Sequence, residues 1–439
     1  MHNICLIGDI LVDVTLKNKD ENLKMRLGGV SHSARGLWAI SANYSLGYIS
    51  PKYLDERIHN YFDHYDSPKL FKVADTLNAP NLILIEEARE IGDQGYDLIL
   101  RENNRYNYLD FESPKCDSFL ITSGEYDISR ILGKLGVYPI SLEVANLSLE
   151  DLCALNFKFK NIFISTSSKI FLKYIETNNF DFKTFASLFE RLCEKLVLKE
   201  NRGGTRLYDF IEDKVHQVSS QTMPIQHSVG VGDVFNAIFE SAIYSKVDEN
   251  LALASFVAAE YASTTFPMNF KNSVEKILKI PTNDLVGLQG TILNWENRKD
   301  INIYIAAPDF DFVDTSLIDT LEKSLLYHNF SPIRPIKVNG QMKESDSSQQ
   351  KQQYYNEDIR LLNKCKIVIC VLLYNDPGTL VEIGIASEKQ IPVLLYDPFN
   401  LAQNCMLTHS CSLVTNNMDE IICETFIKSS KICKTLKRE

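Results

Sequence analysis

The sequence predicts a two-part α/β protein in which largely parallel sheets alternate with helices. Short apolar, strand-like runs alternate with amphipathic helical runs, and this alternation stops once and begins again near residue 301. The length of 439 residues agrees, because it exceeds one ordinary domain and suits two. We therefore expect domains over residues 1–280 and 300–439, joined by a linker at residues 281–299.

The first domain is predicted from a series of apolar runs. Helical periodicity separates several of them, as at residues 129–135 and 182–192, and two long helical runs follow at residues 234–245 and 251–264. This alternation is typical of a largely parallel sheet. The predicted strands lie at residues 4–7, 82–85, 118–122, 138–142, 162–165 and 195–198.

The second domain is predicted in the same way. A fresh strand at residues 301–305 follows the segment 281–299, which contains Pro, Asn and Gly and has no clear period. A polar stretch at residues 339–353, rich in Ser, Gln and Lys, is predicted to be a mobile loop. The other predicted elements are a helix at residues 316–327, strands at 367–373 and 392–396, and a helix starting near Thr379.

Composition and charge limit the possible functions. A formal net charge of −11 argues against a general nucleic-acid binder, because phosphate contacts need clustered Lys and Arg. No stretch reaches the roughly 18 apolar residues that a membrane span requires. Ten cysteines without C-x-x-C pairs and eight histidines without H-x-x-x-H pairs predict free thiols and no protein metal site. We expect a cytoplasmic, homo-oligomeric protein that acts on small molecules.

A glycine-rich helix start, Gly230-Val231-Gly232-Asp233, is the strongest signal of chemistry. The glycines let the backbone approach a ligand, and the free N–H groups of a helix N-terminus attract an anion. Asp233 would accept a proton from an attacking hydroxyl while phosphoryl oxygens rest on those N–H groups. Taken alone, the run also fits an ordinary strand-to-helix turn with a capping Asp.

Its context favours the chemical interpretation. With the early Gly8-Asp9-x-x-x-Asp13 and the pair Gly28-Gly29, the run resembles the ribokinase-like PfkB family of sugar and nucleoside kinases over about residues 1–280. The resemblance implies a doubly wound α/β/α sandwich that transfers the γ-phosphoryl group of ATP, with Mg²⁺, to a hydroxymethyl group. It implies Asp233 as the catalytic base, Gly230, Val231 and Gly232 as the anion hole, and Asp13, Gly28, Gly29 and Ser33 as substrate-binding residues.

Four positions depart from the family pattern. Ser33 stands where the family usually has Asn, and Ser165-Thr166-Ser167-Ser168 stands where its N-x-x-E motif helps to place Mg²⁺. The strand end that normally carries Asp carries Glu143, and the nucleotide-side T-x-G-x-x-G motif lacks its first Gly at residues 198–203. Loss of a Mg²⁺-linked carboxylate removes charge that the transition state needs. A ligand-sensing pseudokinase domain is therefore the alternative to a working kinase.

A second signal is the turn and helix that begin at Asp376-Pro377-Gly378-Thr379. Glu382 falls about one turn into the helix, where the helix dipole favours a carboxylate, and Gly384 and Ala386 leave room beside it. Taken alone, the segment also fits an ordinary helix with a capping Asp and a capping-box Glu quite well.

The residues around this motif favour a catalytic role for Glu382 over a capping role. With the strand end Tyr304-Ile305-Ala306-Ala307-Pro308 and a helical Asp358, the motif D-x-G-T-x-x-E-x-G-x-A resembles the nucleoside 2-deoxyribosyltransferase family over about residues 300–400. The resemblance implies a flavodoxin-like domain in which Glu382 attacks the anomeric carbon of an N-glycoside. Asp376 and Asp358 would orient the sugar or protonate the base, and Tyr304 would position Glu382. A second family Asp is replaced in the segment Lys364-Cys365-Lys366.

The two resemblances together predict a bifunctional nucleoside- or sugar-processing enzyme. One half would phosphorylate a sugar or nucleoside, and the other would cleave or exchange an N-glycosidic bond. Two alternatives stay open: a pseudokinase half that senses a ligand and regulates the glycosidic site, and an interaction scaffold with neither activity.

Overall fold

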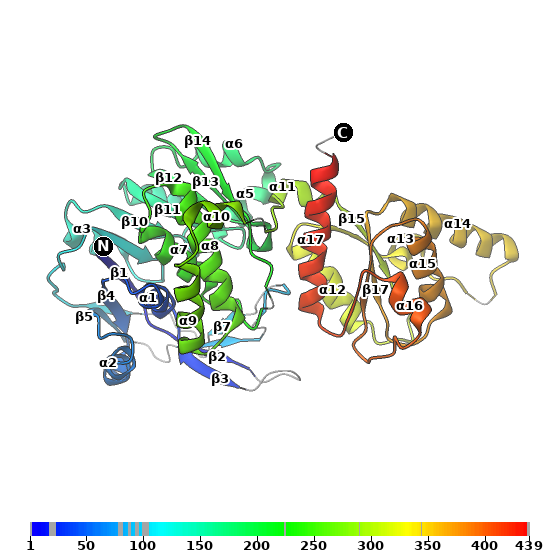
Figure 1. Ribbon diagram of the computed structural model, residues 1–439, viewed down its shortest axis with the longest axis horizontal. Coiled ribbons are helices and arrows are strands. Elements are labelled where there is room, and N and C mark those ends of the chain that lie inside the picture. Colours follow the sequence, from blue (N-terminus) through cyan, green and yellow to red (C-terminus); the bar gives the residue numbers. More distant parts are fainter. Residues whose placement is uncertain are drawn as a thin grey trace. The chain divides into compact units, whose positions relative to one another are not determined.

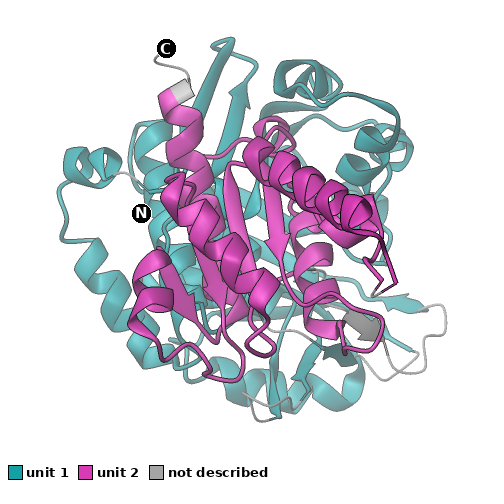
Figure 2. Ribbon diagram, turned by 90° about the vertical axis from the view of Figure 1, so that its right-hand side faces the viewer, with its two compact units in different colours: residues 1–89, 94–292 teal, residues 90–93, 293–439 magenta. Residues whose placement is uncertain are grey.

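The structure, a computed structural model, describes residues 2–16, 23–77, 82–86, 89–92, 96–98, 105–223, 225–288, 290–343 and 345–436. The chain divides into two compact units, coloured separately in Figure 2. Unit 1 comprises residues 1–89 and 94–292, and unit 2 comprises residues 90–93 and 293–439. Each unit has its own sheet and its own hydrophobic core.

Unit 1 is built on a ten-stranded sheet in the order β14-β13-β12-β11-β10-β9-β1-β4-β5-β8. The strands from β12 to β5 in this order run parallel, whereas β13, β14 and β8 pair antiparallel at the two edges. The strands are β1 Ile4–Asp9, β4 Tyr44–Ser50, β5 Lys69–Thr76, β8 Tyr106–Tyr108, β9 Ser118–Thr122, β10 Ile140–Glu143, β11 Phe159–Ser165, β12 Cys193–Lys199, β13 Thr205–Asp209 and β14 Lys214–Val218.

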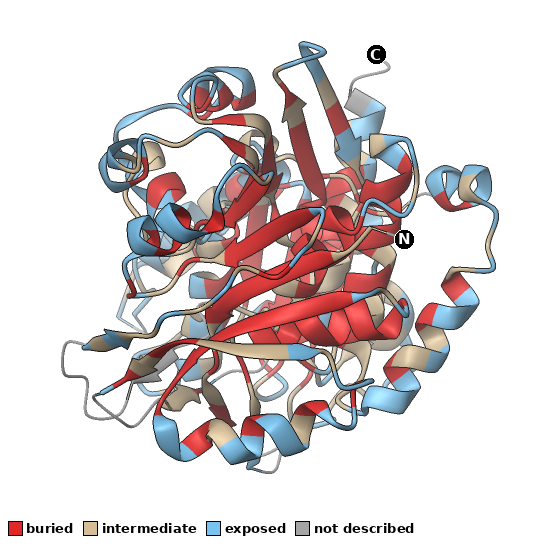
Figure 3. Cartoon of the chain, turned by 90° about the vertical axis from the view of Figure 1, so that its left-hand side faces the viewer, coloured by how far each residue is buried: buried red, intermediate tan, exposed pale blue. Residues whose placement is uncertain are grey.

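Apolar layers cover both faces of this sheet. Ile4, Cys5, Leu6 and Ile7 of β1 are all 0% exposed, and successive side chains of a strand point to opposite faces. On one face lie α1, α7 and α8, and α9 packs against α1 and α8, so that their buried residues join the sheet in one core (Figure 1). Figure 3 shows the largely buried strands of this unit in red. The helices are α1 Val30–Ala39, α2 Asp55–Phe62, α3 Ile128–Leu135, α4 Leu149–Ala154, α5 Lys169–Thr177, α6 Phe182–Ser187, α7 Val231–Glu240, α8 Val247–Ser263, α9 Pro267–Ile277 and α10 Thr282–Gly287, with short 3-10 turns at Lys52–Leu54 and Asn201–Gly203.

A separate four-stranded sheet places two of the predicted substrate residues. Its order is β3-β2-β6-β7, with β2 Val12–Thr15, β3 Lys24–Leu27, β6 Leu82–Ile85 and β7 Tyr96–Leu98. The chain enters β2 two residues after β1 ends, and β2 pairs antiparallel with β3 so that Asp13 lies opposite Arg26. Gly28 directly follows β3 and therefore lies close to Asp13.

Unit 2 is a three-layer sandwich. Its strands all run parallel in the order β16-β15-β17-β18-β19, which is the 2-1-3-4-5 order of flavodoxin-like folds. The residues of β17 are all buried, and they alternate between two clusters: Ile367 and Ile369 lie in one, Val368 and Cys370 in the other. The strands are β15 Asn302–Ala306, β16 Ser331–Ile333, β17 Ile367–Val371, β18 Val393–Tyr396 and β19 Leu413–Thr415.

The helices of unit 2 divide between those clusters. The first cluster includes residues of α12 and α17, and the second includes residues of α14 and α15. Helices therefore cover both faces, which confirms the predicted α/β class for this half. The helices are α11 Trp295–Arg298, α12 Ser316–Tyr327, α13 Pro335–Asn339, α14 Ser348–Lys364, α15 Pro377–Glu388, α16 Cys405–Ser410 and α17 Met418–Leu436.

Three local predictions were wrong. The helix predicted over residues 234–245 ends at Glu240, and a turn follows it. The polar stretch predicted as a loop becomes helical at Ser348, because Ser347 and Gln350 form a reciprocal capping box and start α14. Only Leu361 and Leu362 of α14 are buried, so the sequence shows no apolar periodicity from which this helix could have been predicted. The helix predicted over residues 182–192 ends at Ser187, after which the chain turns toward β12.

The segment 281–299 is not structureless. It contains α10 and α11, and Ser220 and Thr291 form a bridge within unit 1. Trp295 is buried in unit 2, and its carbonyl accepts a hydrogen bond from Asn329 at 2.8 Å. Among the described helices, none is both long enough and apolar enough to cross a bilayer.

Candidate active sites

The start of α7 has the geometry of an anion-binding helix terminus. Gly230 adopts a left-handed conformation with φ of 76°, and a Cβ there would lie 2.1 Å from the His32 ring. The N–H of Val231 donates to the Ser228 carbonyl at 3.3 Å. Within the described part of the chain, the N–H groups of Gly232 and Asp233 have no acceptor, so they are available to an anion.

Asp233 lies in a cluster of three charged side chains. The pKa of Asp233 is raised to about 7, mainly by burial and also by the charge of Glu143, while Lys199 opposes both effects. The Lys199 Nζ lies 3.4 Å from the Gly232 carbonyl and 3.0 Å from Asn236 Oδ1. A carboxyl group with a pKa near neutrality is suited to accept and return a proton, and the neighbouring ammonium is suited to hold phosphoryl oxygens.

Asp13 is a buried and ionised acceptor. Its Oδ2 lies 3.0 Å from His32 Nε2 and 3.6 Å from Arg26 Nε. Burial opposes ionisation, but the His32 hydrogen bond and the nearby guanidinium groups lower the pKa of Asp13. Gly28 leaves room for the Asp13 carboxylate, since a Cβ at residue 28 would lie 2.0 Å from Asp13 Oδ1. Glycine is therefore required next to Asp13 whether or not a sugar approaches.

His32 is buried beside Asp13 and does not face solvent. It is 2% exposed, and its Nδ1 lies 2.7 Å from the Tyr261 hydroxyl. Arg35 donates to the same hydroxyl at 2.7 Å. Sequence patterns did not reveal this network, because Tyr261 lies on the apolar helix α8, about 230 residues from His32 along the chain.

Gly29 lies at the start of α1, and Ser33 connects α1 to α7 by a hydrogen bond. Gly29 has φ of 59°, and a Cβ there would lie 2.2 Å from the Asp9 carbonyl oxygen. The Ser33 hydroxyl donates to the carbonyl of Asp233 at 3.2 Å and is buried. Ser33 thus ties α1 to the first turn of α7.

Residues 165–168 stand where the kinase family has its N-x-x-E motif. Here the serine hydroxyl groups of this segment form hydrogen bonds with one another. Ser165 Oγ lies 2.7 Å from Ser167 Oγ and 3.2 Å from Ser168 Oγ, and Ser168 Oγ also accepts the Ser165 N–H. Glu143, at the end of β10, is the carboxylate that the structure brings close to Asp233 and Lys199. Carboxylate oxygens suit Mg²⁺, so Glu143 fits a metal that also contacts substrate phosphates.

Unit 2 brings Glu382 and Tyr304 into contact. The Tyr304 hydroxyl, on β15, donates to Glu382 Oε1 at 2.5 Å. The pKa of Glu382 is raised to about 7, mainly by burial and also by the charges of Asp358 and Asp376, while the Tyr304 hydrogen bond opposes the rise. Three carboxyl groups therefore share one site, and one oxygen of Glu382 is held in place by a neutral donor.

Asp376 and Asp358 form different hydrogen bonds in unit 2. Asp376 caps α15, and its Oδ2 accepts from the Thr379 N–H at 2.7 Å and the Thr379 hydroxyl at 2.9 Å. Asp358 is half-buried on α14 and accepts from Asn339 Nδ2 at 2.7 Å. Burial raises the pKa of Asp358. A capping box joins the capping residue to the third residue of the helix. In α15 that third residue is Thr379, so Glu382 takes no part in a capping box.

The site lies where strand order reverses. Tyr304 is on β15, and Glu382 is on the helix that follows the adjacent strand β17, on the side of the sheet that Tyr304 faces. Flavodoxin-like sheets bind ligands at such switch points. A Cβ at Gly384 would meet nothing within 4 Å, whereas Ala386 is 0% exposed and belongs to the core, so only Gly384 leaves open space.

Solved structures similar to the chain are named as kinases. A nucleoside kinase of Methanocaldococcus jannaschii, an archaeal member of the ribokinase family, is 15% identical, with a TM-score of 0.45 over 63% of this chain and 99% of that one. Tetrameric phosphofructokinase-2 of Escherichia coli is 12% identical, with a TM-score of 0.48 over 64% and 100%. A Burkholderia thailandensis nucleoside kinase in complex with inosine is 12% identical, with a TM-score of 0.45 over 63% and 96%.

The C-terminal unit has a family match of its own. No curated protein matches the chain. Residues 303–418 match the family model described as nucleoside 2-deoxyribosyltransferase, and this span contains Tyr304, Asp358, Asp376 and Glu382. The resemblance predicted for the C-terminal part of the chain, to the nucleoside 2-deoxyribosyltransferase family, is thereby confirmed.

Proposed function

We propose that the chain is a bifunctional nucleoside-processing enzyme whose C-terminal unit cleaves or exchanges N-glycosidic bonds of (deoxy)nucleosides or their nucleotides. The observation that carries this proposal is the 2.5 Å hydrogen bond from Tyr304 to Glu382 Oε1. It fixes one carboxylate oxygen and leaves Oε2 to react, which is the arrangement that a glycosyl-accepting carboxylate needs.

The reaction would proceed in two steps. Glu382 Oε2 attacks the anomeric carbon, a C–O bond forms, and the C–N bond breaks with its electron pair moving to the base. Asp358 or Asp376 supplies the proton that the departing base takes up, and Tyr304 holds the nucleophile throughout. The glycosyl ester is then opened by a second base, which gives transfer, or by water, which gives hydrolysis.

An assay of base release tests this half of the proposal. The full chain is offered 2′-deoxynucleosides and their monophosphates, with and without an acceptor base, and free base and exchanged nucleoside are measured. Glu382→Ala should abolish both products, whereas Glu388→Ala, exposed at the end of the same helix, should not. Base release by Glu382→Ala at the wild-type rate would exclude Glu382 as the nucleophile.

The N-terminal unit, in the same proposal, phosphorylates a sugar or nucleoside. Asp233 accepts the proton of the attacking hydroxymethyl group, and Asp13 holds a neighbouring hydroxyl. The N–H groups of Gly232 and Asp233 and the ammonium of Lys199 hold phosphoryl oxygens, while Glu143 would hold Mg²⁺. When bound, ATP with Mg²⁺ supplies the transferable phosphoryl group. A small-molecule substrate, a homo-oligomeric state and a cytoplasmic location complete the proposal.

A ligand-sensing pseudokinase is the second candidate for this unit. The mutually bonded hydroxyls of Ser165, Ser167 and Ser168 favour it, because they provide no charge for a metal. ADP formation from ATP–Mg²⁺ with a panel of sugars and nucleosides separates the two. Turnover above the Asp233→Ala background supports the kinase. Saturable nucleoside binding without turnover supports the sensor.

A further inference from the structure

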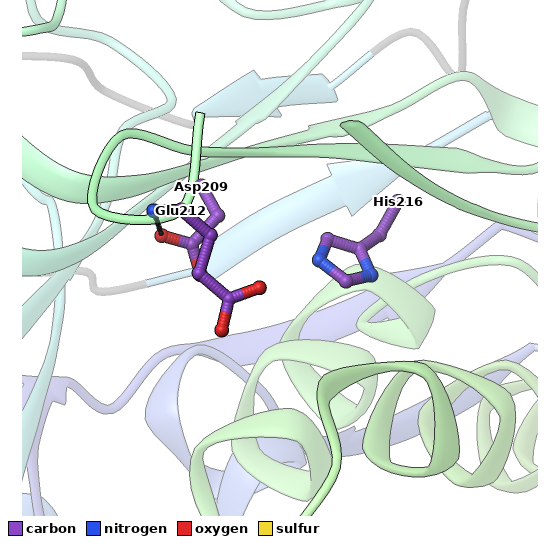
Figure 4. A group of neighbouring side chains, drawn as sticks. All are labelled: Asp209, Glu212 and His216. Carbon is purple, nitrogen blue, oxygen red and sulfur yellow. Dashed lines mark hydrogen bonds between the residues drawn. The ribbon is translucent and has the colours of Figure 1, made fainter. Parts of the chain in front are cut away.

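Three side chains that commonly ligate metals meet at the hairpin between β13 and β14. Asp209 ends β13, Glu212 lies in the turn and His216 lies on β14. One ligand atom from each lies within 4.8 Å of the others, and Figure 4 shows a ring nitrogen of His216 facing the two carboxylates. Neither proposed reaction uses these residues.

His216 supplies an independent indication that a ligand belongs there. The residue is 5% exposed, and its Nε2 is a buried polar atom without a hydrogen-bond partner among the described residues. Buried polar atoms are nearly always paired, so an unpaired one calls for an explanation. The other ring nitrogen, Nδ1, lies 2.6 Å from Asp248 Oδ1 on α8. A proton on Nδ1, donated to Asp248, leaves the Nε2 lone pair directed at the carboxylates.

Asp209 is already engaged, which limits how it would bind. Its Oδ1 accepts from the N–H groups of Ile211 and Glu212, at 2.9 and 3.2 Å, and its Oδ2 lies 2.5 Å from Lys195 Nζ. A metal would take a remaining lone pair of this carboxylate or displace Lys195. Bonds of about 2.0–2.2 Å bring tetrahedral ligand atoms to within about 3.5 Å of one another. The exposed Glu212 in the turn can move inward to reach this spacing.

We propose that Asp209, Glu212 and His216 bind a divalent transition-metal ion such as Zn²⁺ or Mn²⁺, with Asp248 orienting the histidine. One imidazole with two carboxylates suits these ions better than Mg²⁺ or Ca²⁺, which prefer oxygen ligands. A carboxylate behind a ligating histidine is the usual outer partner of such sites.

The location indicates a structural ion. Asp209 pairs with Lys195 near the start of β12, whereas Thr205 pairs with Lys199 at the end that leads to the Asp233 cluster. The proposed ion therefore lies at the end of the sheet opposite the phosphoryl site. Through His216 and Asp248 it would fasten the edge hairpin to α8.

Titration with Co²⁺ tests the proposal on the full chain without nucleotide, with visible absorption as the readout. The wild type should bind one Co²⁺ ion with a d–d spectrum of nitrogen and oxygen ligands, and Zn²⁺ should displace it. Glu212→Gln and His216→Gln should each weaken binding at least about 10-fold, and Asp248→Asn about 10- to 100-fold. His64→Gln changes an exposed histidine in the turn after α2; it is the control and should bind like the wild type.

Glu212→Gln keeps the test decisive, because this exposed turn residue can change without disturbing the core. Melting curves without metal verify that each variant is folded. Cobalt bound to the exposed thiols of Cys153 or Cys405 would show sulfur charge-transfer bands and be insensitive to Glu212→Gln. Equal affinity of the wild type and Glu212→Gln, or no binding by the folded wild type, overturns the proposal.

Discussion

Replacing Glu382 by Gln should stabilise unit 2 at neutral and alkaline pH while removing the proposed nucleophile. The pKa of Glu382 rises from its ordinary 4.5 to about 7 in the folded chain, mainly through burial. An acid with a raised folded pKa favours folding of the protonated form. The stability that this form provides is complete below pH 4.5 and is lost as the pH rises through 7.

The expected gain follows from this difference. At about 1.4 kcal/mol for each pKa unit, the charged carboxylate destabilises the folded unit by about 3 kcal/mol above pH 7. This is an upper value, since Glu382 is partly exposed. Gln can accept the Tyr304 hydrogen bond without carrying charge. For a unit of about 150 residues, melting should rise by about 6–12 °C at pH 8.

Scanning calorimetry at pH 8 and pH 5 measures the effect. The advantage of Glu382→Gln over the wild type should shrink to about 1 kcal/mol at pH 5, where the wild-type carboxyl group is protonated in the folded state. Glu388→Gln, on the exposed end of the same helix, should show no such pH-dependent gain. Equal melting temperatures of wild type and Glu382→Gln at pH 8, or a gain of equal size at both pH values, would refute the reasoning.

Three further outcomes are expected. Asp233→Asn should lower ADP formation by about 10²- to 10⁴-fold. Wild-type turnover should rise as the pH increases through about 7, because Asp233 must be ionised to accept a proton. A flat pH profile of wild-type turnover would contradict this role. Tyr304→Phe should slow base release by about 10- to 100-fold, the kinetic equivalent of a lost hydrogen bond to a charged group, and an unchanged rate would show that Tyr304 does not position Glu382. Gly230→Ala should destabilise unit 1 by more than about 1 kcal/mol in urea unfolding, because its φ is positive and His32 occupies the Cβ position. Gly133→Ala, in open space on α3, should instead stabilise by about 0.5–1 kcal/mol, and similar effects of the two changes would contradict the steric argument.

Patterns that depend on neighbouring residues predicted the structure well. The strands β15, β17 and β18 and the helix at residues 316–327 follow from periodicity, and α12 has the predicted bounds. The short strands β16 and β19 were not predicted. The helix starts at Gly230 and Asp376 were also readable, since glycine, proline and capping residues act within one turn. The structure brings Glu382 to Tyr304, as the motif resemblance implied.

Features that depend on distant residues were not predictable in this way. Tyr261 reaches His32 from a helix whose apolar pattern shows only that it is buried. Lys199 could have been noticed as a charge that ends an apolar strand, but its nearness to Glu143 and Asp233 follows from strand order. The four-stranded sheet containing Asp13 depends on pairing between β2 and β6, about 70 residues apart in the chain.

Side chains alternate along β17 between the two faces of the sheet in unit 2, so substitutions on the two faces should have different consequences. Ile367 and Ile369 contact the layer of α12 and α17, whereas Val368 and Cys370 lie beneath α14 and α15, which carry Asp358 and Glu382. Volume changes at the first pair would displace helices that bear none of the proposed reacting groups. The same changes at the second pair would shift the carboxylates against Tyr304. Substitutions that change side-chain volume should therefore impair the proposed reaction less on the face of α12 and α17 than on the face of α14 and α15.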